Sequence, residues 1–130
     1  MQVARPLERE SGGVDSVIRS VLYLEPMGGD YDAVVAFYRR EDVLAHALQQ
    51  PGCLGSEIQV PTSGRGPILV TALWTGQEAY DGWVSSPVRA AGSSGLAELI
   101  QGLDESTRGE TYTVAISVGQ PIPAPPEGAE

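Results

Sequence analysis

Four side chains that suit the binding of an aromatic molecule lie close together in the sequence: Trp74, Tyr80, Trp83 and Arg89. Aromatic rings provide flat apolar surface, and tyrosine and tryptophan each add a polar atom at the ring edge. An arginine guanidinium is a planar donor that binds phenolate and carboxylate oxygens. A pocket built from these side chains suits a flat organic molecule rich in oxygen, so this segment is the candidate site.

The elements that carry these residues are predicted from local patterns. The apolar segment Ile68–Trp74 is typical of a strand, and residues 77–85 are predicted to form a short helix after it. Pro87 suits a first helical turn, which places Arg89 in a further helical segment. The candidate site is therefore expected at the end of a strand and in the helices that follow it.

The rest of the chain supplies three more strands, predicted from their alternation of apolar and polar residues, over 16–25, 54–60 and 111–118. A long helix is predicted from its N-cap Asp30 to Gln50, where Pro51 and Gly52 follow. Residues 96–103 carry a weaker helical pattern. The order β-α-β-β-α-β is ferredoxin-like and predicts an α+β fold with an antiparallel sheet and helices on one face.

The domain is expected to span residues 15–119. Residues 1–14 are polar and predicted to be a flexible arm, and the proline-rich residues 120–130 are predicted to be a disordered tail. The strand 68–74 is apolar on both faces, so the sheet face without helices also needs cover. We expect a second copy of the chain to provide it, which predicts a homodimer.

Charge excludes several classes of function. The net charge is −9, and all eight cationic residues are arginines, scattered from Arg5 to Arg108. Nucleic-acid binding requires clustered positive charge, so no nucleic-acid partner is expected. The absence of lysine excludes Schiff-base chemistry and a P-loop lysine.

No membrane segment, metal or cofactor is expected. The apolar runs are shorter than the roughly 20 residues that cross a bilayer, and the N-terminus lacks an apolar run of signal-peptide type. A single cysteine, Cys53, agrees with a soluble protein of the reducing cytoplasm. One cysteine and one histidine make a metal or haem site sparse. We expect Cys53 to be a small buried residue and His46 to face solvent on the polar side of its helix.

Three motifs together resemble the antibiotic biosynthesis monooxygenase family: Gln50-Pro51-Gly52-Cys53-Leu54 before a strand, a strand ending in Leu73-Trp74, and the segment Glu78–Pro87. The resemblance covers about residues 17–118 and implies a small dimeric α+β barrel. It also implies a cofactor-independent oxygenase acting on an aromatic or polyketide intermediate of antibiotic biosynthesis, whose deprotonated substrate itself reduces O₂. The family's tryptophan, tyrosine and arginine then correspond to Trp74, Tyr80 and Arg89, as catalytic residues.

Further substrate-binding residues are predicted around this group: Ser20, Tyr23, Tyr38, Val70 and Trp83. Tyr23 shares a face of the first strand with Arg19, which needs an acidic partner or an anionic ligand if that face is enclosed. The hydroxyl of Tyr80 needs a partner if it is buried, and a substrate is one candidate.

The chain departs from the family because it contains no asparagine. The polyketide-oxidising relatives use an asparagine on the strand that leads to the tryptophan, where this chain has Val70 and Thr71. Haem degradation is not expected, since the haem-degrading relatives use an asparagine on the first strand and a histidine after the second helix, whereas this chain has no asparagine and no histidine after His46. Three functions stay open: the oxygenase, a polyketide cyclase or isomerase without O₂ chemistry, and a non-catalytic binding or accessory protein whose tryptophans only build core and dimer interface.

Overall fold

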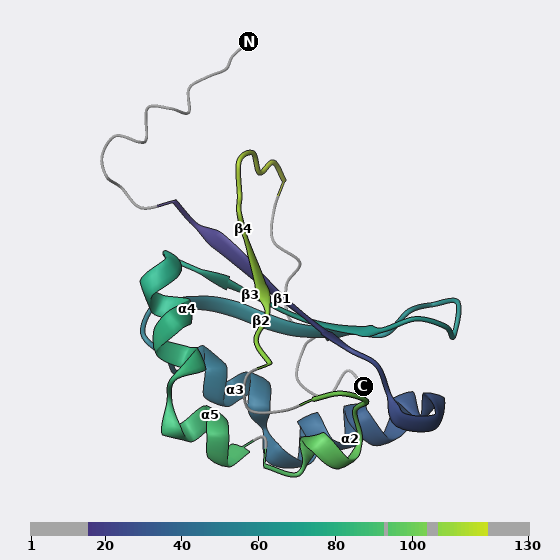
Figure 1. The fold of residues 1–130 in the computed structure, drawn as a ribbon. Coiled ribbons are helices and arrows are strands. Elements are labelled where there is room, and N and C mark those ends of the chain that lie inside the picture. Colours follow the sequence, from purple (N-terminus) through teal and green to yellow (C-terminus); the bar gives the residue numbers. More distant parts are fainter. Residues whose placement is uncertain (1–15, 93, 104–106, 120–130) are drawn as a thin grey trace, which may run out of the picture.

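A single antiparallel sheet with helices on one face makes up the fold (Figure 1). The computed structural model describes residues 16–92, 94–103 and 107–119. The elements are β1 (Ile18–Leu24), η2 (Met27–Gly29), α2 (Tyr31–Glu41), α3 (Val43–Leu48), β2 (Cys53–Gln59), β3 (Ile68–Trp74), α4 (Gln77–Val84), α5 (Pro87–Gly92), η3 (Leu96–Glu98) and β4 (Glu110–Thr113).

The strand order is β2-β3-β1-β4, and all three pairings are antiparallel. This order confirms the predicted ferredoxin-like α+β arrangement. The predicted arm (residues 1–14) and tail (residues 120–130) lie outside the described residues.

Alternation along the central strands assigns each side chain to one of two faces. On β1, Ile18, Ser20 and Leu24 are buried beneath the helices, whereas Arg19 and Tyr23 are exposed on the opposite, open face. The pairing of Ser20 with Ala72 in β3 continues the helix-covered face across the sheet. The two faces of β1 therefore have different environments, as the period of two requires.

The long helix predicted over residues 30–50 is wrong in one respect, because it is two helices. Asp30 does cap α2, since its Oδ1 atom accepts a hydrogen bond from the Ala33 N–H at 3.0 Å. Asp42 then adopts a left-handed conformation with φ of 55°, which ends α2 and begins α3 in a new direction. Aspartate tolerates this conformation better than most residues, and the sequence pattern gave no sign of the break.

Two other predicted elements are shorter than expected. The last strand ends at Thr113, which pairs with Ile18 at the start of β1. Beyond this point Ile116 and Val118 are 84% and 91% exposed, so the predicted strand over 111–118 is wrong past Thr113. The weak helical pattern over 96–103 corresponds only to the 3₁₀ turn η3.

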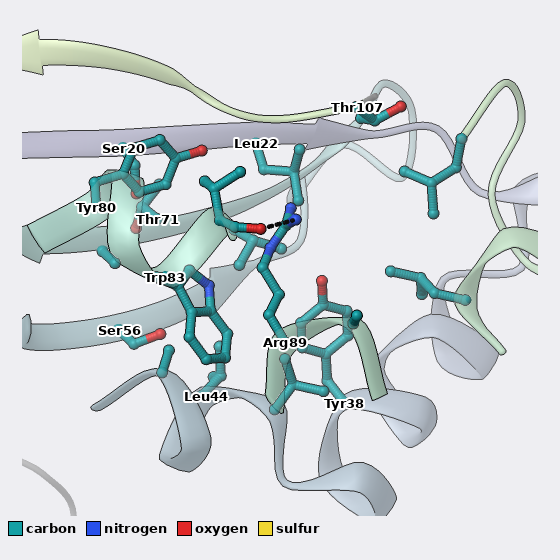
Figure 2. A pocket seen from close by; sticks show the side chains of 18 of the residues that line it. Ser20, Leu22, Tyr38, Leu44, Ser56, Thr71, Tyr80, Trp83, Arg89 and Thr107 are labelled. Atoms are coloured by element: carbon teal, nitrogen blue, oxygen red, sulfur yellow. Dashed lines mark hydrogen bonds between the residues drawn. The ribbon is translucent and has the colours of Figure 1, made fainter. Parts of the chain in front are cut away.

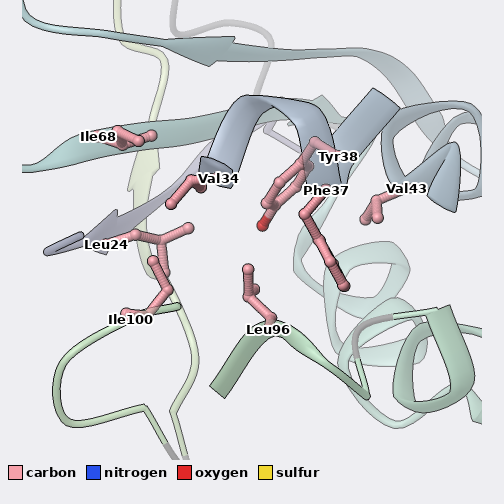
Figure 3. Packing of buried hydrophobic residues seen from close by; sticks show 8 residues of the cluster. All are labelled: Leu24, Val34, Phe37, Tyr38, Val43, Ile68, Leu96 and Ile100. Atoms are coloured by element: carbon pink, nitrogen blue, oxygen red, sulfur yellow. The ribbon is translucent and has the colours of Figure 1, made fainter. Parts of the chain in front are cut away.

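Two groups of buried side chains fill the space between the sheet and the helices. The first cluster consists of Leu24, Val34, Phe37, Tyr38, Val43, Ile68, Leu96 and Ile100 (Figure 3). The second cluster consists of Ile18, Ala47, Ala72, Trp74, Tyr80 and Trp83. The first lies under α2 and η3, and the second joins the ends of β1 and β3 to α3 and α4.

Candidate functional site

A cavity of about 700 Å³ lies where the two clusters meet, on the helix-covered face of the sheet. The predicted site residues that line it are Ser20, Tyr38, Val70, Trp74, Tyr80, Trp83 and Arg89. They come from two strands and three helices and are spread widely over the sequence (Figure 2). The fold thus gathers them around one space, although their chemical roles stay predictions.

The floor of the cavity is formed by the sheet. Val70, Ala72 and Trp74 lie on the helix-covered face of β3 at spacings of two. Trp74 is fully buried, and its Nε1 atom donates a hydrogen bond to the Ser20 Oγ atom at 2.9 Å. Because this bond engages the indole N–H, Trp74 presents its ring to the cavity as an apolar wall.

Helix α4 supplies a second aromatic wall. Tyr80 and Trp83 are three positions apart and both buried against the sheet. The rings of Tyr80 and Trp74 meet edge to face, with centroids 5.6 Å apart. The Tyr80 hydroxyl oxygen accepts a hydrogen bond from the Gly109 N–H at 2.8 Å. The buried Tyr80 hydroxyl therefore has a hydrogen-bond partner within the chain, the backbone N–H of Gly109.

A polar end of the cavity is formed by α2 and α5. Figure 2 shows the hydroxyl of Tyr38 pointing toward the side chain of Arg89. Burial raises the pKa of Tyr38 to about 12, against an opposing effect of the nearby Arg89 charge. Tyr38 is thus a neutral hydrogen-bond donor at ordinary pH. The Arg89 guanidinium donates to the Val84 carbonyl at 3.5 Å, which fixes its stem along the end of α4.

One predicted site residue lies elsewhere. Tyr23 is 49% exposed on the open face of the sheet, together with Arg19, and does not line this cavity. Its placement follows from strand alternation, since Ser20 and Leu22 occupy the cavity side of β1.

His46 and Cys53 also lie outside the cavity lining. His46 as a whole is half-buried, but its Nδ1 atom is buried and faces Gly92 of α5, so the prediction that this side chain faces solvent holds only in part. The pattern of α3 alone did not reveal that α5 packs over it. Cys53 is half-buried beside the second cluster, and burial raises the pKa of its thiol.

The sequence patterns did not predict the site residues that lie between α5 and β4. Leu96 and Thr107 line the cavity, and Gly109 holds the Tyr80 hydroxyl. This part of the chain has no regular helix or strand period, so only the composition of short polar and glycine residues marked it as a loop.

Within the described residues, no group of three or more His, Cys, Asp or Glu side chains is placed to hold a metal ion. The helices described there are all too short or too polar to cross a membrane.

The match to a known family agrees with this geometry. Residues 32–93, which run from the second residue of α2 to just past α5 and include most of the cavity residues, match the model of the antibiotic biosynthesis monooxygenase family. Over these residues the chain is similar to this family. No curated protein sequence matches it.

Solved structures with the same fold include a cofactor-independent oxygenase and putative antibiotic biosynthesis monooxygenases. SnoaB from Streptomyces nogalater, a cofactor-independent oxygenase solved as a mutant, superposes with a TM-score of 0.61 at 14% identity, covering 82% of this chain and 99% of SnoaB. A putative antibiotic biosynthesis monooxygenase from Chloroflexus aurantiacus gives a TM-score of 0.57 at 19% identity, covering 83% of this chain and 100% of that protein. A putative antibiotic biosynthesis monooxygenase from Nitrosomonas europaea gives a TM-score of 0.64 at 10% identity, covering 81% of this chain and 96% of that protein. At such identities the likeness establishes the fold.

Proposed function

We propose that this protein is a cofactor-independent monooxygenase of the antibiotic biosynthesis monooxygenase family, which oxidises a flat aromatic or polyketide-type intermediate of secondary metabolism. The observation that carries the proposal is the cavity of about 700 Å³, which is lined by aromatic rings and by the polar side chains of Tyr38 and Arg89. Its size and mixed lining suit a multi-ring organic molecule with oxygen substituents. SnoaB, which shares the fold, is a cofactor-independent oxygenase.

In the proposed reaction the substrate supplies the electrons. A phenol or anthrone loses a proton to solvent, and the resulting carbanion reduces O₂ to form a carbon-bound hydroperoxide. Loss of water from this hydroperoxide leaves a carbonyl, so one CH₂ group and one O₂ become one C=O group and one water. The protein's part is to orient the rings between Trp74 and Trp83 and to stabilise the enolate oxygen with donors such as Tyr38 and Arg89.

The experiment is oxidation of a simple substrate by purified, metal-free protein. With anthrone or a naphthol, we expect quinone formation and consumption of one O₂ per carbonyl formed. Arg89→Gln is expected to lower kcat by roughly 100-fold, the effect of removing one donor to a developing oxyanion. Arg40→Gln is the matched control, because Arg40 is an exposed arginine of α2 that lies outside the cavity lining. Absence of both quinone and O₂ uptake across a panel of such substrates would refute the oxygenase.

A second candidate is a polyketide cyclase or isomerase that uses the same cavity without O₂. The absence of asparagine from the chain favours it, because the residue expected beside the tryptophan of the oxygenases is missing. Tyr38 and Arg89 would then stabilise the enolate of a folded chain. Turnover that continues unchanged under strict anaerobiosis distinguishes this candidate from the oxygenase.

The proposed enzyme is a homodimer that uses the open face of the sheet. Tyr23 and Tyr112 are each 49% exposed there, and Leu69 and Leu73 share that face through their pairing with β1. Burial of these side chains in a partner would remove apolar surface from water. Sedimentation equilibrium is expected to give twice the chain mass, and Leu69→Arg is expected to give monomers.

A further inference from the structure

A short segment between η3 and β4, Thr107–Gly109, runs along the edge of the cavity beside Tyr80. Thr107 lines the cavity, as Figure 2 shows, and the Gly109 N–H donates to the Tyr80 hydroxyl oxygen at 2.8 Å. At its far end the segment enters β4, where Glu110 pairs with Val21 of β1. The segment, called the strap below, is therefore fixed to the sheet next to a buried phenol.

Arg108 attaches the strap to α4 from the outside. Its guanidinium carbon lies 5.4 Å from the centre of the Tyr80 ring, a cation–π geometry. Its Nη2 atom is 2.9 Å from the Asp81 Oδ1 atom. The hydrogen bond from Gln77 and then that from Arg108 lower the pKa of Asp81, so this carboxylate stays charged at neutral pH. Arg108 thus contacts both the ring of Tyr80 and the residue that follows it in sequence.

Gly109 allows the close approach of backbone to phenol. A Cβ atom built on Gly109 would lie 2.9 Å from the Val21 carbonyl oxygen and 3.0 Å from the Tyr80 hydroxyl. Both neighbours are held in place, one by the sheet and one by the packing of a buried ring. A larger residue would therefore push the strap away from Tyr80.

We propose that the strap positions Tyr80 for hydrogen bonding to the substrate, an inference that rests on the proposed function of the cavity. A phenol oxygen has one proton to donate and two lone pairs that accept. Because Gly109 occupies a lone pair, the hydroxyl proton is left to turn toward a ligand. Arg108 holds the ring at the angle that this requires. Tyr80 then donates to a substrate oxygen that gains negative charge, while Arg108 and Gly109 act only through Tyr80.

Kinetics of two strap variants test this proposal. With anthrone as substrate, Gly109→Ala is expected to lower kcat about 10-fold, as for loss of one buried hydrogen bond. Arg108→Gln is expected to lower kcat about 2- to 5-fold, the effect of an exposed cation–π contact, and Arg108→Lys is expected to restore part of it. The KM is expected to change little, because the Tyr80 bond strengthens as charge develops on the substrate.

The matched control is Arg40→Gln. Arg40 also lies 5.4 Å from an aromatic ring, that of Phe37, and also pairs with a neighbouring carboxylate, that of Glu41. It does not line the cavity, so its loss is expected to leave kcat unchanged. An equal fall in kcat for Arg40→Gln and Arg108→Gln would overturn the proposal.

A spectroscopic readout separates this proposal from the proposed function. The chain has five tyrosines, and labelling their ring Cζ atoms with ¹³C gives one resonance each, with Tyr80 assigned by its loss in Tyr80→Phe. We expect Gly109→Ala and Arg108→Gln to move the Tyr80 resonance and to abolish its further shift on addition of 2-naphthol. If these changes occur without any oxidation of anthrone, the oxygenase fails and the strap's role stands. If the Tyr80 resonance is unmoved in both variants, the strap's role fails. Arg108 is exposed, so Arg108→Gln keeps the test valid if Gly109→Ala unfolds the chain.

Discussion

The two hydrophobic clusters under the sheet differ in what their side chains have to satisfy. The first cluster is mainly aliphatic, and Leu24, Val34 and Ile68 in it are fully buried. The second cluster contains Trp74, Tyr80 and Trp83, and two of these side chains make hydrogen bonds: Trp74 with Ser20 and Tyr80 with Gly109. Apolar burial explains the aliphatic part of the first cluster, whereas the second cluster also depends on matched polar groups.

The cavity occupies the boundary between these clusters. Tyr38, Val43 and Leu96 of the first cluster line it, as do the aromatic residues of the second. Residues such as Leu24 and Val34 lie outside the lining and only pack. Stability and ligand binding therefore depend on two sets of side chains that overlap only in part. The following substitutions test whether the two effects can be separated.

The largest loss of stability is expected from the first cluster. Leu24→Ala removes a fully buried side chain, and the free energy of unfolding is expected to fall by about 2–5 kcal/mol, through lost burial and the void left behind. Leu24 lies outside the cavity lining, so the folded variant is expected to bind 2-naphthol normally. Urea unfolding and a fluorescence titration measure the two quantities. Leu48→Ala, at a site that is 52% exposed, is the control and is expected to change the stability by less than about 0.5 kcal/mol.

A smaller loss with a specific signature is expected from the Trp74–Ser20 pair. Ser20→Ala leaves the buried indole N–H of Trp74 without its acceptor, which is expected to lower the free energy of unfolding by about 1–3 kcal/mol. Adding Trp74→Phe removes the orphaned donor, so the double variant is expected to lose less than the sum of the two single variants. Strict additivity in this cycle would show that the hydrogen bond contributes nothing to the second cluster.

Stability is expected to depend on alkaline pH through Tyr38, which belongs to the first cluster and also lines the cavity. Its pKa is raised in the folded state to about 12 from an ordinary value of 10.0, so folding favours the neutral phenol. This contribution is complete below pH 10 and is lost as the pH rises toward 12, with a slope of up to about 1.4 kcal/mol per pH unit. Tyr38→Phe is expected to remove that part of the slope, as measured by urea unfolding across this range. An unchanged slope would mean that Tyr38 does not titrate with unfolding.

The smallest effect on stability, with a clear effect on ligand binding, is expected at the polar end of the cavity. Arg89→Gln is expected to change the free energy of unfolding by about 1 kcal/mol or less, because the side chain is only half-buried. Affinity for a hydroxynaphthoate is expected to fall about 10-fold or more, since a charge-assisted bond to the ligand is lost. Methyl esters of the same ligand serve as the control, and an equal loss of affinity for the ester would argue against a charge effect.

Local patterns in the sequence predicted much of the framework. The segment Ile68–Trp74 forms a strand with the predicted bounds, and Gln77 begins the predicted helix α4. The cap at Asp30 and the helical turn at Pro87 were also predictable, because each depends on the chemistry of a few neighbouring residues. The break at Asp42 and the early end of β4 were not, since a left-handed residue and the length of a partner strand leave no periodic mark.

By itself, the sequence determined which residue types are present and in which elements they lie: aromatic rings at the end of β3 and in α4, an arginine in α5, and no lysine or asparagine. Only the tertiary structure decided which of them share a space. It placed Ser20 on the cavity side of β1 and Tyr23 on the open side, and it brought Gly109 to Tyr80 across 29 positions of sequence. The physical reason is range: capping, periodicity and turns act between neighbours in the chain, whereas the face that the helices cover depends on packing between distant segments.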